Sequence, residues 1–190
     1  MNLYTNNLTE TKQVLDNADI TYSISEIDYL SPDLHEVHFK IREEYLLAKL
    51  IGSGCGLSDM PVVSDDLWLS NTKITSLPDN LTVGGYLDLE DTLITRLPDN
   101  LSVGDTLDLE NTNITELPDN LSVGGLNLRN TPITKLPDNF SVGGYLDLEN
   151  TKITRLPDNL TVGGSLDLSY TNITELPDNL TVGGKIYKDF

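Results

Sequence analysis

The chain has 190 residues, of which 38% are hydrophobic and 6% are aromatic, and its Lys and Arg number 12 against 30 Asp and Glu. The resulting net charge of −18 repels nucleic acid and anionic membranes and favours partners with a basic surface, although acidity also serves solubility alone. This length predicts one domain, or one domain with a small appendage.

The chain carries no sign of an oxidising or membrane environment. Its single cysteine, Cys55, excludes an internal disulfide and a cysteine-based zinc site. The opening stretch MNLYTNNLTETKQ lacks the basic and apolar regions of a signal peptide, and no apolar run has the length of a membrane span. We therefore expect a cytosolic protein, in which sequons such as Asn80-Leu81-Thr82 are by-products of repetition.

Residues 1–64 have no repeat. Helical spacing occurs in residues 8–18 (LTETKQVLDNA) and in residues 42–50 (REEYLLAKL), and the second segment stops at Gly52. Residues 20–27 (ITYSISEI) alternate as a strand does. These patterns predict a small α+β module.

The segment SPDLHEVHFKI, residues 31–41, has two open interpretations. Pro32 would start a helix well, whereas the apolar residues from Val37 to Ile41 alternate as in a strand. His35 and His38 are three residues apart, not four as in the zinc-protease motif, and no third ligand stands out. A solvated histidine pair is the favoured interpretation.

The stretch GSGCG, residues 52–56, superficially suggests a phosphate loop or a nucleophile. It follows a predicted helix rather than a strand and lacks the Lys-Ser/Thr pair of a P-loop, so we interpret it as a linker. Among the many carboxylates, nothing identifies an acid and a base in unlike environments. The sequence predicts no enzyme, no cofactor and no metal site.

From residue 65 onward the chain repeats itself. Aligned on a Leu-x-Leu pair, the units begin at Leu67, Leu87, Leu107, Leu126, Leu146 and Leu166. The interval is 20 residues except before Leu126, where SVGGLNL lacks one residue, and a further start appears at Ile186. Such a period is typical of a solenoid, because no single coil can bury its apolar face alone.

Within one unit, Leu87 and Leu89 alternate about Asp88, which predicts a strand. Leu101 and Val103 alternate in the same way and predict a second short extended segment. The LPDN motif between the two favours a turn, and the Val-Gly-Gly steps allow backbone angles closed to other residues. No unit keeps a helical period.

This pattern resembles the short leucine-rich repeat, L-x-L-x-x-N-x-L-x-x-LP, of bacterial effectors and of other bacterial and phage proteins. The resemblance covers about residues 65–186 and implies the cytoplasm of a bacterium or of an infected host cell. Where the family usually has a buried Asn, this chain has Thr72, Thr92, Thr112, Thr131, Thr151 and Thr171. We expect the Thr hydroxyl to do a smaller version of the same hydrogen bonding to the backbone. This departure leaves a flatter β-solenoid open as well.

The predicted architecture is an α+β N-terminal cap, residues 1–64, on a leucine-rich-repeat-like β-solenoid, residues 65–190. The solenoid has short parallel strands, about six coils and little helix in its repeats. At its far end, two interpretations are open. Either Lys185, Lys188 and Asp189 blunt an exposed sheet edge, or two chains meet there as a homodimer.

Equivalent residues of stacked strands form columns with a spacing of roughly 4.8 Å. In the family that the repeats resemble, three columns about the leucine pair lie on the concave sheet, the usual ligand face. The column before the first leucine holds Asp66, Tyr86, Thr106, Gly125, Tyr145 and Ser165. The column between the leucines holds Trp68, Asp88, Asp108, Asn127, Asp147 and Asp167, and the column after them holds Ser70, Glu90, Glu110, Arg129, Glu149 and Ser169.

Two interpretations of the acidic columns are open. Opposed like charges cost about 0.2–1 kcal/mol per pair, so stability alone would not select them. Alternatively, one Asp and one Glu were copied with the repeat and are screened by water. Interleaved Tyr and Trp, which are favoured interface anchors, support a binding surface. The predicted partner-binding residues are Trp68, Tyr86, Asp88, Glu90, Asp108, Glu110, Arg129, Tyr145, Asp147, Glu149, Asp167 and Tyr170.

We therefore predict a non-enzymatic protein–protein interaction module, an inhibitor of the phage anti-defence or toxin-immunity type, with no direct binding to nucleic acid or membrane. The alternative is an acidic DNA mimic that blocks a nucleic-acid-binding protein. Calcium binding by the acidic columns is a third hypothesis, although the chain lacks the compact loop of dedicated sites. If the concave sheet is not the binding face, the N-terminal module or the flank around Lys152 and Arg155 is the next candidate.

Overall fold

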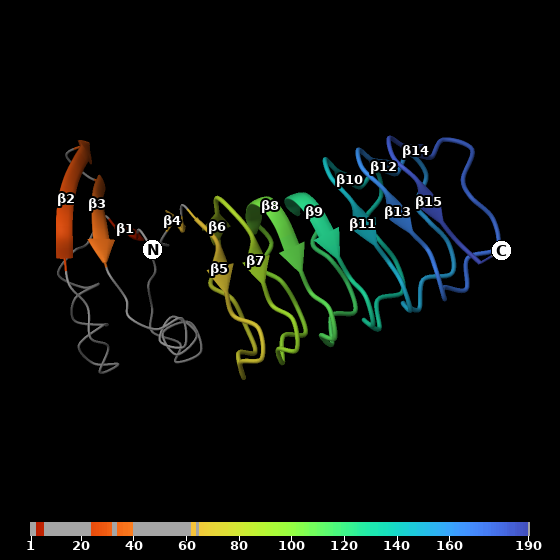
Figure 1. Cartoon of the computed structure of the whole chain (residues 1–190), viewed down its shortest axis with the longest axis horizontal. Helices are drawn as coiled ribbons and strands as arrows, with labels where there is room; N and C mark the ends of the chain where they lie inside the picture. The colour runs from red at the N-terminus through yellow and green to blue at the C-terminus, as the bar shows by residue number, and fades with distance from the viewer. Residues whose placement is uncertain (1–2, 6–23, 32–33, 40–61, 64, 190) are drawn as a thin grey trace.

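The computed structural model describes residues 3–5, 24–31, 34–39, 62–63 and 65–189. Its N-terminal strands are β1 (Leu3–Thr5), β2 (Ile24–Ser31), β3 (Leu34–Phe39) and β4 (Val62–Val63). β2 pairs antiparallel with β3, β3 with β1, and β1 with β4. β4 continues into the parallel strands of the repeats, so one sheet runs from the N-terminal strands into the solenoid (Figure 1).

The described N-terminal residues are all strand. The strand expected over residues 20–27 is found from Ile24 onward, and residues 34–39 take the strand interpretation rather than the helical one. The helices expected over residues 8–18 and 42–50, and the GSGCG stretch, lie outside the described residues. The helical part of the predicted cap therefore stays a prediction.

The Leu-x-Leu strands form one parallel sheet in which leucine pairs with leucine, except at the last strand, where Ile186 pairs with Leu166. They are β5 (Leu67–Trp68), β7 (Leu87–Asp88), the ends of β8 (Ser102–Asp108) and β9 (Ser122–Asn127), β11 (Leu146–Asp147), β13 (Leu166–Asp167) and β15 (Ile186–Tyr187). The outward side of these strands, with the three columns named above and the turn position directly after them that holds Tyr170, is called the LxL face. It corresponds to the predicted ligand face.

The second extended segment of each unit pairs in the same parallel manner. Its strands are β6 (Thr82–Val83), the beginnings of β8 and β9, β10 (Ser141–Val142), β12 (Thr161–Val162) and β14 (Thr181–Val182). The coils stack side by side along the long axis of the molecule (Figure 1). None of the described residues is helical, so the predicted β-solenoid with little helix in its repeats is confirmed for this part of the chain. Equally, the described residues include no helix with the length and apolar character needed to cross a membrane.

The shortened unit fits without disturbing either set of strands. β8 and β9 pair in the usual register at Val103↔Val123 but one residue short at Thr106↔Gly125. The missing residue is therefore absorbed at the corner between these two pairs. Gly124 stands at this corner, where a Cβ would lie only 2.6 Å from a carbonyl oxygen of the preceding coil. The corner thus requires glycine.

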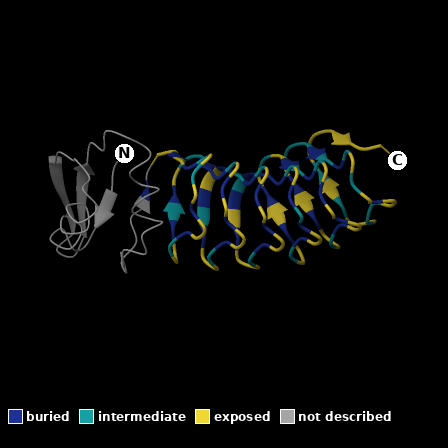
Figure 2. Ribbon diagram, turned by 90° about the horizontal axis from the view of Figure 1, so that it is seen from below, coloured by how far each residue is buried: buried dark blue, intermediate teal, exposed yellow. Residues whose placement is uncertain are grey.

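One continuous core runs through all the coils, as the dark blue interior of Figure 2 shows. In the unit that begins at Leu107, the buried side chains are Leu107, Leu109, Ile114, Leu117, Leu121 and Val123. These are the apolar positions that period-two alternation and the LPDN motif predicted. Because every coil contributes the same positions, each coil is covered by its neighbours.

The threonine column performs the predicted hydrogen bonding. Each Thr Oγ1 donates to the carbonyl oxygen of the leucine three residues earlier, at 2.6–2.8 Å. At Thr112 the backbone N–H also donates to the same leucine carbonyl, at 3.2 Å. The hydroxyl therefore closes a tight turn directly after each Leu-x-Leu strand, and the polar group is buried with a partner.

Two further columns have a left-handed backbone, which the sequence analysis did not foresee. In both columns φ lies between 55° and 60° at Asn71, Asp91, Asn111, Asn130, Asn150 and Tyr170, and at Asn80, Asn139 and Asn159. Asn and Asp adopt this conformation more readily than other residues with a Cβ. Neighbouring amides also bond to each other, as from Asn150 Nδ2 to Asn130 Oδ1 at 2.8 Å. The recurring Asn before Thr was the signal for the first column, and the Asn that ends the LPDN motif was the signal for the second.

Candidate functional site

The residues between the leucines of the LxL face bond to their own backbone. One side-chain oxygen accepts a hydrogen bond from the N–H two residues later, at 2.8–3.0 Å, in Asp88, Asp108, Asn127, Asp147 and Asp167. This local bond ends each strand and starts the turn that the threonine closes. The aspartates between the leucines thus have a structural role, which was part of neither earlier interpretation of the acidic columns, the copied one or the partner-binding one.

The columns are also less solvated than the charge pattern indicated. The exposed fraction is only 7% at Asp88 and 8% at Asn127 and Thr106. The interpretation of an exposed charge that water screens therefore does not hold at Asp88, whose Oδ1 accepts a hydrogen bond from the backbone N–H of Glu90. Asp147 and Asp167 are half-buried.

A hydrogen-bond network occupies the centre of the face around Asp108. The Tyr86 hydroxyl donates to Asp108 Oδ2 at 2.7 Å. The Asn127 amide nitrogen lies 3.0 and 3.2 Å from the two oxygens of the same carboxylate and 3.3 Å from Glu110 Oε2. Glu110 also accepts from Asn130 Nδ2 at 3.4 Å. Three successive coils are joined in this way.

Arg129 continues the network toward the C-terminal coils. Its Nη2 lies 3.1 Å from Glu149 Oε1, and its Nε lies 3.8 Å from Glu110 Oε1. The guanidinium therefore stands between the two glutamates of its column, which is the geometry required for relief of their mutual repulsion. The second ion pair is the weaker one, since the buried Nε makes no hydrogen bond to any described residue.

Aromatic side chains lie at both ends of the network. The rings of Trp68 and Tyr86 are 4.9 Å apart between centroids and tilted by 43°. The ring of Tyr145 covers Gly125, where a Cβ would lie 3.4 Å from two ring carbons. Tyr170 is 72% exposed. Such a set of exposed aromatic side chains on one sheet face is what an interface offers.

The tyrosines of the face stay protonated. Burial raises the pKa of Tyr86, and its hydrogen bond to Asp108 raises that pKa further. Burial also raises the pKa of Tyr145, with Asp108 adding to the increase and a hydrogen bond with Thr106 opposing it. Both hydroxyls are therefore donors rather than bases or nucleophiles at neutral pH.

Two carboxylates hold their protons more tightly than usual. Burial raises the pKa of Asp147, and Asp167 and Glu149 add to this, against a backbone hydrogen bond and Arg129. Burial likewise raises the pKa of Glu90, followed by repulsion from Glu110. Both directions reflect burial and neighbouring negative charge, which Arg129 offsets only in part at Asp147.

One group of carboxylates in the described part of the chain has the geometry for a cation. One oxygen from each of Asp147, Glu149 and Asp167 lies within 4.8 Å of the others. Calcium takes six to eight oxygen ligands, so three carboxylates are too few unless water supplies the rest. Glu149 is also engaged by Arg129. These residues are the ones that would hold a metal ion, but the arrangement gives no reason to assign one.

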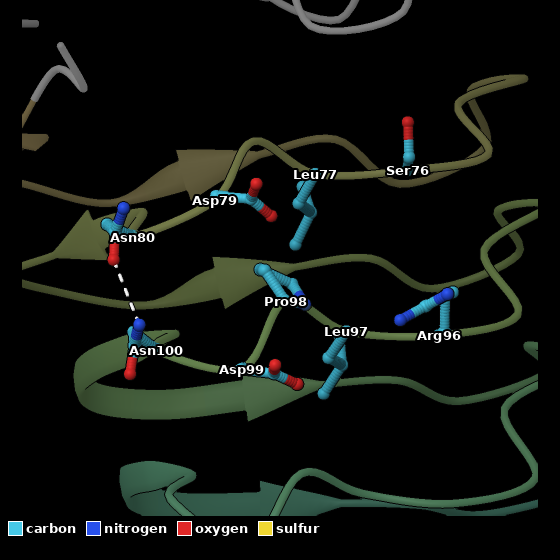
Figure 3. Close-up of a pocket in the computed structure, with 9 residues that line it drawn as sticks. All are labelled: Ser76, Leu77, Asp79, Asn80, Arg96, Leu97, Pro98, Asp99 and Asn100. Atoms are coloured by element: carbon cyan, nitrogen blue, oxygen red, sulfur yellow. Dashed lines mark hydrogen bonds between the residues drawn. The ribbon is translucent and has the colours of Figure 1, made fainter. Parts of the chain in front are cut away.

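Two hollows among the described residues lie on the flank, away from the LxL face. A groove of about 500 Å³ follows the LPDN corners of two coils (Figure 3). It is lined by Ser76, Leu77, Asp79, Asn80, Arg96, Leu97, Pro98, Asp99 and Asn100. A second groove, of about 390 Å³, includes Lys135 and Arg155. Both grooves are lined by residues of both charges without a paired nucleophile and base, so they give no support to an enzymatic site.

Five of the predicted binding residues are thus joined in one network. Tyr86, Asp108, Glu110, Arg129 and Glu149 are joined by bonds, directly or through Asn127. Tyr170 stands outside this network, one position beyond the third column. Sequence reasoning missed the role of Asn127, although its place among the aspartates of one column was visible.

Searches of protein-family models, of curated proteins and of solved structures found no match to this chain. The resemblance to leucine-rich repeats rests on the repeat pattern alone.

Proposed function

We propose that the chain is a non-enzymatic protein-binding module that holds a partner with a basic surface through the LxL face. The observation that carries this proposal is the combination, on one sheet face, of exposed aromatic rings with acidic columns whose charge is only partly compensated from within. Tyr145 and Tyr170 are 40% and 72% exposed. Aromatic anchors beside charged groups are the usual composition of interface hot spots.

The backbone of Tyr170 supports the same proposal. Its φ is 56°, a conformation that costs an ordinary L-residue about 1–2 kcal/mol. Other coils place Asn or Asp at this position, where the cost is smaller. Because the side chain is largely exposed, packing within the chain offers little in return. A strained residue retained on an exposed face is a reason to assign it a binding role.

A DNA mimic remains the alternative, but the face suits it less well. A mimic requires an unbroken path of negative charge that follows the phosphates. Asn127 and Arg129 interrupt both acidic columns in the same coil, and Arg129 introduces a cation. A protein partner tolerates such an interruption, whereas a phosphate-like path does not. An inhibitory role, of the anti-defence or immunity kind, follows if the partner is a defence protein or a toxin.

The test is capture of a partner from host lysate by the immobilised chain at physiological ionic strength. The face variant combines Tyr145→Ala with Asp147→Lys. The matched control combines Leu93→Ala with Asp138→Lys, which removes a side chain of similar exposure (50% against 40% for Tyr145) and makes the same charge change on the flank. We expect the face variant to lose the partner and the control to retain it, with both folded by circular dichroism. Loss in the control alone would move the binding site to the flank.

A further inference from the structure

The interactions within the LxL face indicate which carboxylates are already engaged. Asp108 accepts bonds from Tyr86 and Asn127. Glu110 accepts from Asn127 and pairs with Arg129, which also pairs with Glu149. Asp108 and Glu110 therefore use both carboxylate oxygens for partners inside the chain, whereas Glu149, in the coil of Asp147, is engaged through Oε1 alone.

The carboxylates at the two sides of the face are less engaged. Among the described residues, the carboxylate of Glu90 accepts no hydrogen bond and joins no ion pair. Asp147 and Asp167 each use Oδ1 for the local backbone bond, and no residue that the structure describes donates to their Oδ2. Free acceptor capacity is thus smaller at Asp108 and Glu110 than at the carboxylates on either side of them.

The separation of the two sides follows from the register. Glu90 belongs to the coil of β7, whereas Asp147 and Asp167 belong to the coils of β11 and β13, three and four steps further along the sheet. At about 4.8 Å per step, the separation is roughly 14–19 Å.

Exposed aromatic side chains lie near the carboxylates on each side of the face, and they are an observation separate from the charges. Trp68, 46% exposed, packs against the tilted ring of Tyr86, which belongs to the same coil as Glu90. Tyr145 and Tyr170 belong to the same coils as Asp147 and Asp167 and are exposed as well. An arginine of a partner gains both a carboxylate and a ring face at such a place.

We infer that the LxL face binds its protein partner at two separate points, each of which takes a cationic side chain, about 14–19 Å apart along the solenoid. The first point is Glu90 with Trp68, and the second is Asp147 and Asp167 with Tyr145 and Tyr170. Arg129 and Asn127 form the spacer between them, which repels or fails to attract a third cation. The inference rests on the proposed function and specifies the partner's surface as two cationic groups at this separation.

The probes for the test are two alanine-based helical peptides of the same composition, each with two arginine pairs. In one peptide the pairs are 11 residues apart, about 16 Å along a helix; in the other they are 4 residues apart, about 6 Å. Trp68 is the single tryptophan of the chain, so its fluorescence reports binding near the first point. Binding is measured by fluorescence and by NMR shifts at low ionic strength.

We expect the widely spaced peptide to bind about tenfold more tightly, since only it can reach both points. Glu90→Gln, or Asp147→Asn with Asp167→Asn, should abolish this preference, whereas Asp138→Asn on the flank should leave it unchanged. Replacing the spacer by Asn127→Asp with Arg129→Gln should raise the affinity of the closely spaced peptide.

Equal binding of the two peptides, or a preference for the close spacing, would overturn the two-point inference while protein binding by this face stands. Binding of neither peptide would also overturn it, and the capture experiment above then decides the proposed function separately.

Discussion

The interior columns and the columns of the LxL face belong to the same strands, yet the residue type is constant from coil to coil in the interior and changes from coil to coil on the face. Inside, Leu107, Leu126 and Leu146 occupy one position and are all 0% exposed. Outside, the neighbouring position holds Trp68 in one coil, Asp in most and Asn127 in another. The interior is uniform because every coil meets the same packing problem, so it records folding alone. The differences between coils on the face have no such explanation and are where function is to be sought.

The largest effect on stability is expected from a substitution in the interior. Leu109→Ala removes a fully buried side chain in the middle of the solenoid and should lower the free energy of unfolding by about 3–5 kcal/mol. Leu93→Ala, at an exposed position of the neighbouring coil, should change it by less than about 0.5 kcal/mol. Urea denaturation followed by circular dichroism measures both. Similar losses in the two variants would contradict the assigned core.

The threonine column offers a smaller effect of the same kind. Thr112→Val deletes the hydrogen bond from Oγ1 to the carbonyl of Leu109, which keeps the backbone N–H of residue 112 as a donor. The carbonyl is not orphaned, so we expect a loss of about 1 kcal/mol. Thr115→Val, at an exposed site, is the control. If Thr112→Val left the free energy of unfolding unchanged or raised it, the hydroxyl of Thr112 would not stabilise the turn.

On the face, one substitution should separate stability from binding. Tyr170→Asn places a residue that accepts the left-handed backbone at φ 56° and should stabilise the chain by about 1 kcal/mol. The same change removes an exposed ring and should weaken partner binding. Calorimetry and the capture assay measure the two effects. Stabilisation with binding intact would show that Tyr170 is not part of the binding surface.

The pH dependence should also differ from that of most proteins. The pKa of Glu90 and of Asp147 is raised in the folded chain above the ordinary 4.5 and 3.8. The folded state therefore binds these protons more tightly than the unfolded state, and the stabilisation is lost as pH rises through the raised values. We expect a higher melting temperature near pH 5 than near pH 7, and a smaller difference in Glu90→Gln with Asp147→Asn. An unchanged difference in this variant would assign the effect to other groups.

The repeat pattern was sufficient to predict the interior. Alternation about Asp88 and Ser102, the LPDN turn and the role of Thr112 are local features, and each coil repeats them. The interactions across the face were not predictable in the same way. Nothing in the sequence shows that Asp108 receives the Tyr86 hydroxyl from the coil before it, because that bond depends on side-chain direction rather than on register.

The exceptions to the repeat were visible in the sequence, but their structural consequences could not be predicted from it. The lost residue before Leu126 is obvious, yet its absorption at Gly124 depends on how two extended segments meet at a corner. The left-handed column could have been inferred from recurring Asn, and Tyr170 would then have stood out as its exception.

The most direct test of the central claim is oxidative footprinting of the captured complex. Trp68, Tyr145 and Tyr170 on the LxL face and Leu93 on the flank are all exposed and oxidisable, with exposed fractions of 40–72%. If the face is the binding surface, the partner should protect the three aromatic residues and leave Leu93 as reactive as in the free chain. Protection of Leu93 with Tyr145 and Tyr170 still reactive would contradict it.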